Sequence, residues 1–285
     1  FMIVLFSVLF TRENRPPESS VVNDVPVAGK TQAVLSLPDG RQVALGNEKE
    51  QDTAWMKYVE ACTIESKATT EPADIKIEVA RGGEYKIRLE DGTTVWLNSE
   101  SSLIYPEKFT GDKRAVRLSG EGYFEVARDE KKPFIVSVTD MEIKVLGTKF
   151  NVTAYQDEKM TTTTLISGAV EVVTPHRSVQ LQPGKQAMVQ EGDDDITVLE
   201  VDVELATSWT AGIFKFDKMA LTDICTRLSR WYDIDFVFEG ETGKEKFTGG
   251  TWKYVPLKDF LSKIERVTNV LFLFENNTVR VVPKK

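Results

Sequence analysis

Paired carboxylates are the side chains of this sequence with the greatest capacity for catalysis. Glu121 and Glu125 lie close together, and residues 193–195 form a run of aspartates. A glycosidase needs two carboxylates about 5 to 10 Å apart across a cleft. Glu121 and Glu125, however, belong to the alternating segment GEGYFEV, in which polar residues face solvent. The aspartate run follows a glycine and lacks the spacing of a Ca²⁺ loop. We therefore predict solvated carboxylates, no catalytic residue and no enzymatic activity.

The cysteines and the histidine do not form a recognisable reactive site. Cys62 and Cys225 are far apart, and neither lies in a C-x-x-C or metal-binding pattern. We expect Cys225 to be a core residue, and the sequence leaves open a disulfide that would join two domains. His176 is the only histidine, so a triad or a histidine-based metal site would depend on it alone. The sequence predicts no metal and no cofactor.

Aromatic residues on strands support a different class of function, because they can form a platform for sugar rings. On half-buried strands such residues more often pack in the core or across strands. The candidates are Trp96, Tyr105, Phe124 and Trp252. A carbohydrate-binding β-protein is therefore the alternative interpretation.

The overall composition is that of an ordinary globular protein. The chain has 285 residues, of which 41% are hydrophobic and 28% are charged. Its formal net charge is -8, whereas binding to a nucleic-acid backbone needs a basic face. We predict no nucleic-acid partner.

The first ten residues, FMIVLFSVLF, are nearly all apolar. A membrane-spanning helix needs about 20 such residues, so this segment fits the end of one. A signal peptide would need a basic region before it and a small-residue cleavage site after it. A buried strand is the third interpretation. We expect residues 1–10 to be the remnant of a transmembrane helix in a fragment of a longer protein, and residues 11–30 to be a linker.

Residues 31–205 are expected to form a large all-β domain. Apolar and polar residues alternate in short runs between turn signals, which is typical of strands. The clearest runs are 33–37, 85–89, 94–97, 116–118, 123–126, 134–138, 142–146, 150–154, 162–166, 169–173 and 187–189. Only residues 53–61 suggest a helix. The pattern fits either an antiparallel sandwich or a solenoid-like stack.

An internal repeat lies in this region. AVLSLPDGRQVALGNE (33–48) aligns with YKIRLEDGTTVWLNSE (85–100). We expect Asp39-Gly40 and Asp91-Gly92 to form primed hairpin turns, in which both central residues have positive φ. The two segments are either equivalent hairpins of a repetitive β architecture or unrelated hairpins with similar turns.

Residues 206–285 are expected to form a small α+β module. Apolar residues recur at helical spacing over 220–232, and again over 257–267 after Pro256. Strand-like segments at 212–216, 234–238, 247–252, 270–274 and 279–282 complete the order β-α-β-β-α-β-β.

Several longer segments resemble the motifs of FecR-type anti-sigma regulators. ARGGEYKIRLEDGTTVWLNSESSLIYPEKF (80–109) and LSGEGYFEVARDEKKPFIV (118–136) resemble the family's central motifs, with Gly122 where alanine is usual. VLGTKFNVTAY and LQPGKQA resemble two further ones. Residues 214–238 and FTGGTW (247–252) resemble the family's C-terminal module, which is similar to the signalling domains of TonB-dependent transporters and secretins. The resemblance covers roughly residues 31–282 and is closest to the version common in Bacteroidetes.

The resemblance implies partners and a location. A cytoplasmic domain missing from this chain would hold an extracytoplasmic-function sigma factor, and one helix would cross the inner membrane. The region in hand would lie in the periplasm, where its C-terminal module would meet the signalling domain of a TonB-dependent outer-membrane transporter. That contact would lead to proteolysis and release of the sigma factor. The transporter's ligand is left open between an iron chelate and a glycan.

Strand addition at an exposed sheet edge is the contact mode we expect for the C-terminal module. The flank strand 212–216 and the segment 247–254 are the two candidate edges. The predicted partner-binding residues are Phe214, Phe216, Phe247, Trp252 and Tyr254. The alternative is a periplasmic carbohydrate-binding β-protein without a signalling role.

Overall fold

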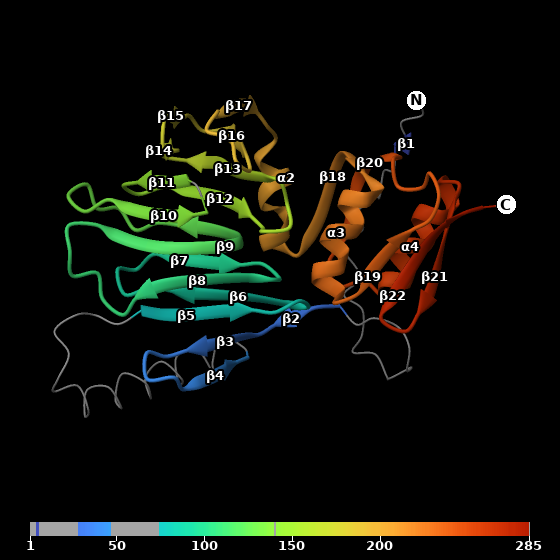
Figure 1. The fold of residues 1–285 in the computed structure, drawn as a ribbon, viewed down its shortest axis with the longest axis horizontal. Coiled ribbons are helices and arrows are strands. Elements are labelled where there is room, and N and C mark those ends of the chain that lie inside the picture. Colours follow the sequence, from blue (N-terminus) through green and yellow to red (C-terminus); the bar gives the residue numbers. More distant parts are fainter. Residues whose placement is uncertain (1–3, 6–27, 47–73, 140, 285) are drawn as a thin grey trace. The chain divides into compact units, whose positions relative to one another are not determined.

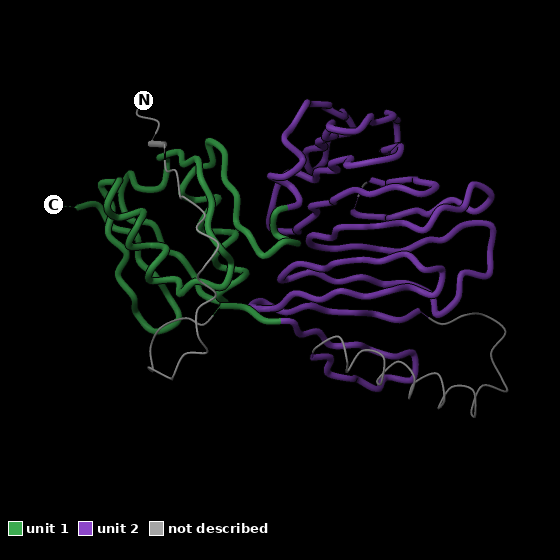
Figure 2. The backbone as a smooth tube through the Cα atoms, turned by 180° about the vertical axis from the view of Figure 1, so that it is seen from behind, with its two compact units in different colours: residues 1–30, 208–285 green, residues 31–207 purple. Residues whose placement is uncertain are grey.

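The structure is a computed structural model in which residues 4–5, 28–46, 74–139 and 141–284 are described (Figure 1). The chain divides into two compact units, shown in purple and green in Figure 2. Residues 31–207 form the unit that we call the β domain. Residues 1–30 and 208–285 form the unit that we call the C-terminal module. The expected fold class, a large all-β part followed by a small α+β module, is confirmed.

The β domain is built from short strands. They are β2 (Lys30–Thr31), β3 (Ala33–Ser36), β4 (Gln42–Leu45), β5 (Asp74–Val79), β6 (Gly83–Arg88), β7 (Thr94–Leu97), β8 (Ser101–Pro106), β9 (Arg114–Glu125), β10 (Phe134–Val138), β11 (Met141–Val145), β12 (Lys149–Ala154), β13 (Met160–Ser167), β14 (Val170–Val173), β15 (Ser178–Leu181), β16 (Lys185–Gln190) and β17 (Thr197–Glu200). The short helix α2 (Val203–Thr207) follows them.

The strands of the β domain lie in two layers. One layer has the order β4-β3-β5-β8-β9-β10-β11-β14-β15, and the other has the order β2-β6-β7-β9-β12-β13-β16-β17. Apart from the β3–β4 hairpin, the order within each layer follows the sequence, so the strands are stacked one after another (Figure 1). Both layers contribute to one core cluster, which includes Ile77, Leu97, Phe124, Ile143 and Leu165. The sandwich and the solenoid-like stack are therefore two descriptions of one arrangement.

Strand β9 belongs to both layers. Its first half pairs with β8 and in parallel with β10, and its second half pairs with β7 and β12. Gly120 lies where the strand passes between layers and has a φ of 91°. A Cβ atom at this position would lie 2.4 Å from Ser101 Oγ and 2.7 Å from Ser101 Cα. Only glycine fits this crossing point, because it has neither the side chain nor the restriction to negative φ.

A buried ion pair holds the beginning of β9. Arg114 is 2% exposed, and its Nη1 donates to Asp91 Oδ2 (2.7 Å) and to the Ala127 carbonyl (2.8 Å). Its Nε donates to the Lys132 carbonyl at 2.9 Å. Asp91 lies in the turn between β6 and β7. The ion pair therefore connects the beginning of β9, the strand that both layers share, to the β6–β7 hairpin.

The two repeated segments form hairpins with the same turn bonds, but they lie in different layers, with β4 at an edge and β7 beside β9, so the choice between the two interpretations of the repeat stays open. Leu37 N–H donates to the Arg41 carbonyl and Gly40 N–H to the Leu37 carbonyl, and Leu89, Thr93 and Gly92 make the corresponding bonds. The register is also the same, since Leu35 pairs with Val43 as Ile87 pairs with Val95.

The turn type expected for these hairpins is wrong. Positive φ occurs at Gly40 and Gly92 but at neither Asp39 nor Asp91. Each aspartate instead accepts a bond from the backbone N–H two residues later, at 2.9 Å for Asp39 and 3.0 Å for Asp91. Such Asx turns favour ordinary right-handed backbone at the aspartate, and the glycine then takes the single left-handed position of a three-residue loop.

The C-terminal module has the predicted order of elements. It contains η1 (Ser208–Ala211), β18 (Ile213–Ala220), α3 (Leu221–Tyr232), β19 (Asp235–Phe238), β20 (Lys246–Trp252), α4 (Leu257–Val267), β21 (Val270–Glu275) and β22 (Thr278–Pro283). One sheet has the order β1-β20-β18, and the other has the order β19-β22-β21. The apolar faces of both helices join one core cluster with these strands, as their spacing predicts.

The N-terminal apolar segment is described only at β1 (Val4–Leu5), which is extended and pairs in parallel with Phe247 and Thr248 of β20. This matches the strand interpretation at these two positions, and the rest of residues 1–10 lies outside the described residues, as do residues 53–61. Among the residues that the structure describes, no helix has the length and apolar character needed to cross a membrane. Ala28 packs on the core of the C-terminal module, and a Cβ at Gly29 would lie 2.6 Å from the Trp231 ring.

Replacing Gly120 with alanine is expected to destabilise the β domain by about 3 kcal/mol, since backbone strain and overpacking each cost about 1 to 3 kcal/mol. Urea unfolding followed by circular dichroism measures this change. Gly111→Ala is the matched control, because nothing lies within 4 Å of its Cβ position. Equal urea midpoints for the two variants would show that the crossing point tolerates a side chain.

Replacing Asp91 with alanine is expected to cost about 3 to 5 kcal/mol, because it leaves the buried Arg114 cation without its counter-charge. The internal repeat supplies the control. Asp39 occupies the equivalent turn, but its ion pair with Arg41 is exposed, with side-chain exposures of 53% for Arg41 and 44% for Asp39. We expect the Asp39→Ala variant to unfold at the wild-type urea concentration, and an equal loss in both variants would contradict this assignment.

Candidate partner-binding groove

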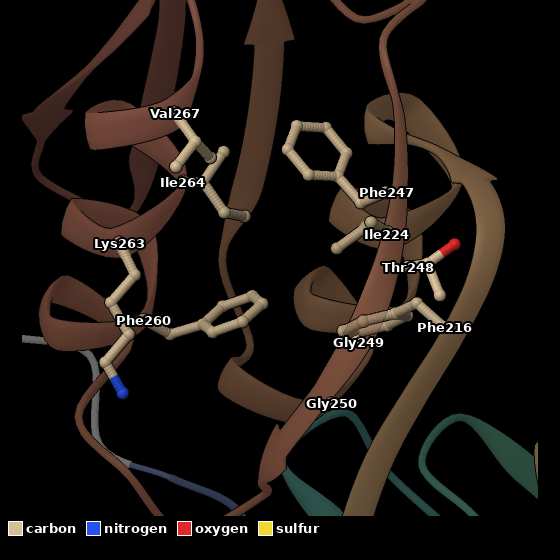
Figure 3. A pocket seen from close by; sticks show the side chains of 10 residues that line it. All are labelled: Phe216, Ile224, Phe247, Thr248, Gly249, Gly250, Phe260, Lys263, Ile264 and Val267. Carbon is tan, nitrogen blue, oxygen red and sulfur yellow. The ribbon is translucent and has the colours of Figure 1, made fainter. Parts of the chain in front are cut away.

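An apolar groove lies between β20 and α4 of the C-terminal module, with contributions from β18 and α3 (Figure 3). Its lining residues are Phe216, Ile224, Phe247, Thr248, Gly249, Gly250, Phe260, Lys263, Ile264 and Val267. All but Thr248 and Lys263 present apolar atoms or bare backbone. The groove is therefore suited to an apolar side chain rather than to a charged small molecule.

Helix α4 forms one wall of the groove through its amphipathic face. Phe260, Ile264 and Val267 recur at positions i, i+4 and i+7, so they lie on one side of the helix. The Phe260 ring lies 6.1 Å from the ring of Phe216, which in turn stacks on Phe214 at 6.2 Å. This aromatic chain links the helix to the sheet and fixes the width of the groove.

Two glycines leave the opposite wall without side chains. Gly249 has a φ of 154°, and a Cβ at Gly250 would lie 2.8 Å from the Phe214 carbonyl oxygen. Gly250 is therefore required by the close approach of β18. The same absence of side chains exposes the β20 backbone to an approaching chain.

The backbone of β20 offers hydrogen-bonding groups along the edge away from β18. Lys253 N–H donates to the carbonyl of Gly212, the residue before β18, at 2.9 Å. Leu221 N–H donates to the Glu245 carbonyl at 2.9 Å. Bonding alternates along an antiparallel ladder, so the odd-numbered residues of β20 bond to β18. Thr248 and Gly250 consequently direct their N–H and C=O groups towards the other edge, where β1 pairs.

The five predicted partner-binding residues occupy different places. Phe216 and Phe247 line the groove, and Phe214 is buried beside it with 7% exposure. Trp252 and Tyr254 are 47% and 48% exposed and do not line it. The apolar face of residues 257–267 was expected as a helix face but, like Lys263, was not among the predicted partner-binding residues. The signals were present in the i, i+4, i+7 spacing and in the glycine pair of FTGGTW.

A caged lysine explains why Trp252 and Tyr254 face outward. The Lys253 side chain is fully buried, with Nζ 3.8 Å from the centre of the Trp231 ring and 5.7 Å from that of Trp209. Cation–π attraction stabilises such an ammonium group. Trp252 and Tyr254 are its two neighbours in the chain, and with the Lys253 side chain turned inward theirs lie at the surface. Tyr254 remains in edge contact with Trp231 at 5.7 Å.

Glu121 is more enclosed than its alternating pattern predicts. Its carboxylate accepts bonds from Asn98 Nδ2 (2.8 Å) and Asn151 Nδ2 (3.0 Å), which flank it on neighbouring strands. Glu125 instead binds Lys149 Nζ at 2.8 Å. Burial, reinforced by the nearby Glu125 charge, raises the pKa of Tyr123 to about 12. Both carboxylates are thus engaged in cross-strand contacts that stabilise the sheet.

The remaining candidate groups are dispersed. Asp194 and Asp195 pair with His176 and Arg177 on an exposed loop. Within the described part of the chain, no group of three or more histidine, cysteine or acidic residues is arranged to hold a metal ion.

The four aromatic residues considered as a sugar platform do not share a surface. Tyr105 and Phe124 are buried in the core of the β domain, at 4% and 0% exposure. Trp96 is half-buried and covered by Lys86, whose Nζ lies 4.6 Å from the ring centre. Trp252 belongs to the C-terminal module. The strand pattern of the sequence could not separate inward from outward aromatic residues.

Cys225 is a free thiol in the core of the C-terminal module, as expected, with 1% exposure. Burial raises its pKa, which keeps the thiol protonated and unreactive. Cys62 lies outside the described residues.

Iodoacetamide is expected to leave Cys225 unmodified in the folded chain and to modify it after unfolding in urea. Peptide mass spectrometry of the two samples measures the labelled fraction. Rapid labelling of Cys225 without urea, or its recovery as a disulfide with Cys62, would contradict the buried free thiol.

Two family models match the chain. A model described as FecR protein matches residues 75–171, and one described as FecR, C-terminal, matches residues 213–281. Two crystal structures of a candidate anti-sigma factor from Parabacteroides distasonis, at 1.65 and 2.50 Å resolution, are similar to it. Each has a TM-score of 0.69 and 30% sequence identity and covers 74% of this chain, which in turn covers 99% and 100% of theirs. No curated protein matches the sequence.

Proposed function

The chain belongs to the FecR family of anti-sigma regulators, and from this we propose that it is the periplasmic part of a membrane-anchored relay. It reports the ligand-bound state of a TonB-dependent outer-membrane transporter to an extracytoplasmic-function sigma factor. The C-terminal module contacts the transporter's signalling domain. The sigma factor is held through a cytoplasmic domain outside this chain.

The observation that carries this proposal is the apolar groove beside the outer edge of β20. It lies in the unit that matches the family's C-terminal model, over residues 213–281. An apolar groove of this kind suits an apolar side chain of a protein segment. By contrast, the carboxylates of the β domain are engaged in contacts within the sheet.

The proposed connection to the inner membrane, with one membrane pass and the remainder in the periplasm, rests on the apolar composition of residues 1–10, although Val4 and Leu5 are extended as β1 in this structure. The alternative carbohydrate-binding role gains no support from the aromatic residues, because two of the four are buried in the core.

Calorimetric titration of the chain with the signalling domain of a transporter encoded beside it tests the relay. Val267 lines the groove and is half-buried, so Val267→Asp places a charge where an apolar segment would dock. We expect this variant to bind at least tenfold more weakly, since docking an apolar segment there would remove the new carboxylate from water and leave the segment without its apolar contact.

Asn269→Asp is the matched control, because it adds the same charge at an exposed position close to the end of α4. It should bind within twofold of the wild type, and thermal melting should show that both variants fold. Absence of binding between the folded wild-type chain and every neighbouring transporter's domain would remove the relay as its function.

A further inference from the structure

The chain passes between the two units twice, after Lys30 and after Thr207 (Figure 2). Within the C-terminal module, both connecting segments pack against the aromatic cage around Lys253. The cage consists of Trp209, Phe214 and Trp231. We infer that the cage is a clasp, which anchors both connecting segments and releases the first of them, residues 28–30, when the groove is occupied. This inference rests on the proposed function and specifies how binding in the groove is passed on.

Trp231 holds the first connecting segment. Its ring is buried and fixed in position, because its Nε1 donates to the Lys253 carbonyl at 2.7 Å. Gly29 lies against the six-membered part of this ring, where a Cβ atom would be 2.6 Å from Cε3 and 2.7 Å from Cζ3. Ala28 packs on the same core. The backbone of Gly29 therefore approaches a fixed ring so closely that a side chain does not fit between them.

Lys253 and Tyr254 hold the second connecting segment, residues 208–212. Lys253 Nζ lies 5.7 Å from the centre of the Trp209 ring, and the Lys253 N–H donates to the Gly212 carbonyl at 2.9 Å. Gly212 has a φ of 74°, and a Cβ there would lie 2.9 Å from Cε2 of Tyr254. The Tyr254 ring in turn makes an edge contact with Trp231, at 5.7 Å between ring centres. Both segments are thus attached to one connected set of side chains.

The groove is linked to this set through two phenylalanines. Phe216 lines the groove and stacks on Phe214, with 6.2 Å between ring centres. Lys253 Nζ lies 5.9 Å from the centre of the Phe214 ring and 3.8 Å from that of Trp231. A side chain that enters the groove contacts Phe216, and a shift of that ring moves its neighbours because a packed core has no free space. The contact between Trp231 and Gly29 is where this shift reaches residues 28–30.

The expected direction is release of the first segment on binding. A relay needs a resting state in which the segment is held and a second state, favoured by the partner, in which it is free. Opening the clasp uses part of the binding free energy, so a chain whose clasp is already open binds more tightly. Because coupling is reciprocal, freeing residues 28–30 and filling the groove favour each other by the same factor.

The first test measures whether the clasp holds the segment. Ala28→Cys places a thiol on the first segment, and Gly29→Ala is combined with it to push the segment off the Trp231 ring. Without any partner, we expect iodoacetamide to label Cys at position 28 at least fivefold faster in this double variant than in Ala28→Cys alone, as measured by peptide mass spectrometry. Cys225 is the internal control and should stay unlabelled. Adding Gly111→Ala instead should change nothing, because its Cβ position is open. Equal labelling of all three chains would overturn the clasp.

The second test adds the signalling domain of the transporter encoded beside the chain. In the complex, the Ala28→Cys chain should be labelled at least fivefold faster than alone. Calorimetry should show at least threefold tighter binding of the domain to Gly29→Ala than to the wild-type chain, with Gly111→Ala equal to wild type. Unchanged or slower labelling in the complex, or equal affinities for Gly29→Ala and wild type, would overturn the coupling and leave the relay intact. Failure of the folded wild-type chain to bind the domain would count against the relay itself.

Discussion

The sharing of β9 between two layers is the constraint on which the β domain depends. A strand that pairs with β8 and β10 in one layer and with β7 and β12 in the other prevents the layers from sliding past each other. The crossing requires a residue without a side chain at Gly120, and the Arg114–Asp91 pair fixes where the strand begins. With this strand in place, each following hairpin extends a layer whose position is already set.

The sequence was informative where one local rule decides the structure. Period-two alternation located the strands, and helical spacing located α3 and α4, since each element buries one face. The turn type failed because a side-chain bond from Asp39 or Asp91 to the backbone outweighed the preference of the dipeptide. The enclosure of Glu121 and the groove itself depend on strands and helices that are distant in sequence, so no local pattern specifies them. Only Phe216 and Phe247 of the predicted residues line the groove, because hydrophobicity alone does not distinguish core from surface.

The two units divide the physical tasks of the molecule. The β domain is a continuous core in which polar side chains such as Glu121 and Asn151 bond across strands. The C-terminal module combines a small core, centred on Trp231 and the caged Lys253, with an apolar groove between β20 and α4. A preformed groove next to a packed core is suited to recognition, because the entropy of ordering falls on the partner segment rather than on the module.

The order of strands in the β domain also determines how it would respond to mechanical force. Since neighbours in the sequence are for the most part neighbours in the stack, tension on its two ends would load the hairpins one at a time. Outer strands such as β17 would peel away first, and the shared β9 would resist longest, because releasing it requires breaking four strand pairings. The domain would therefore yield in steps under load, as an unzipping stack rather than as a single rupturing body.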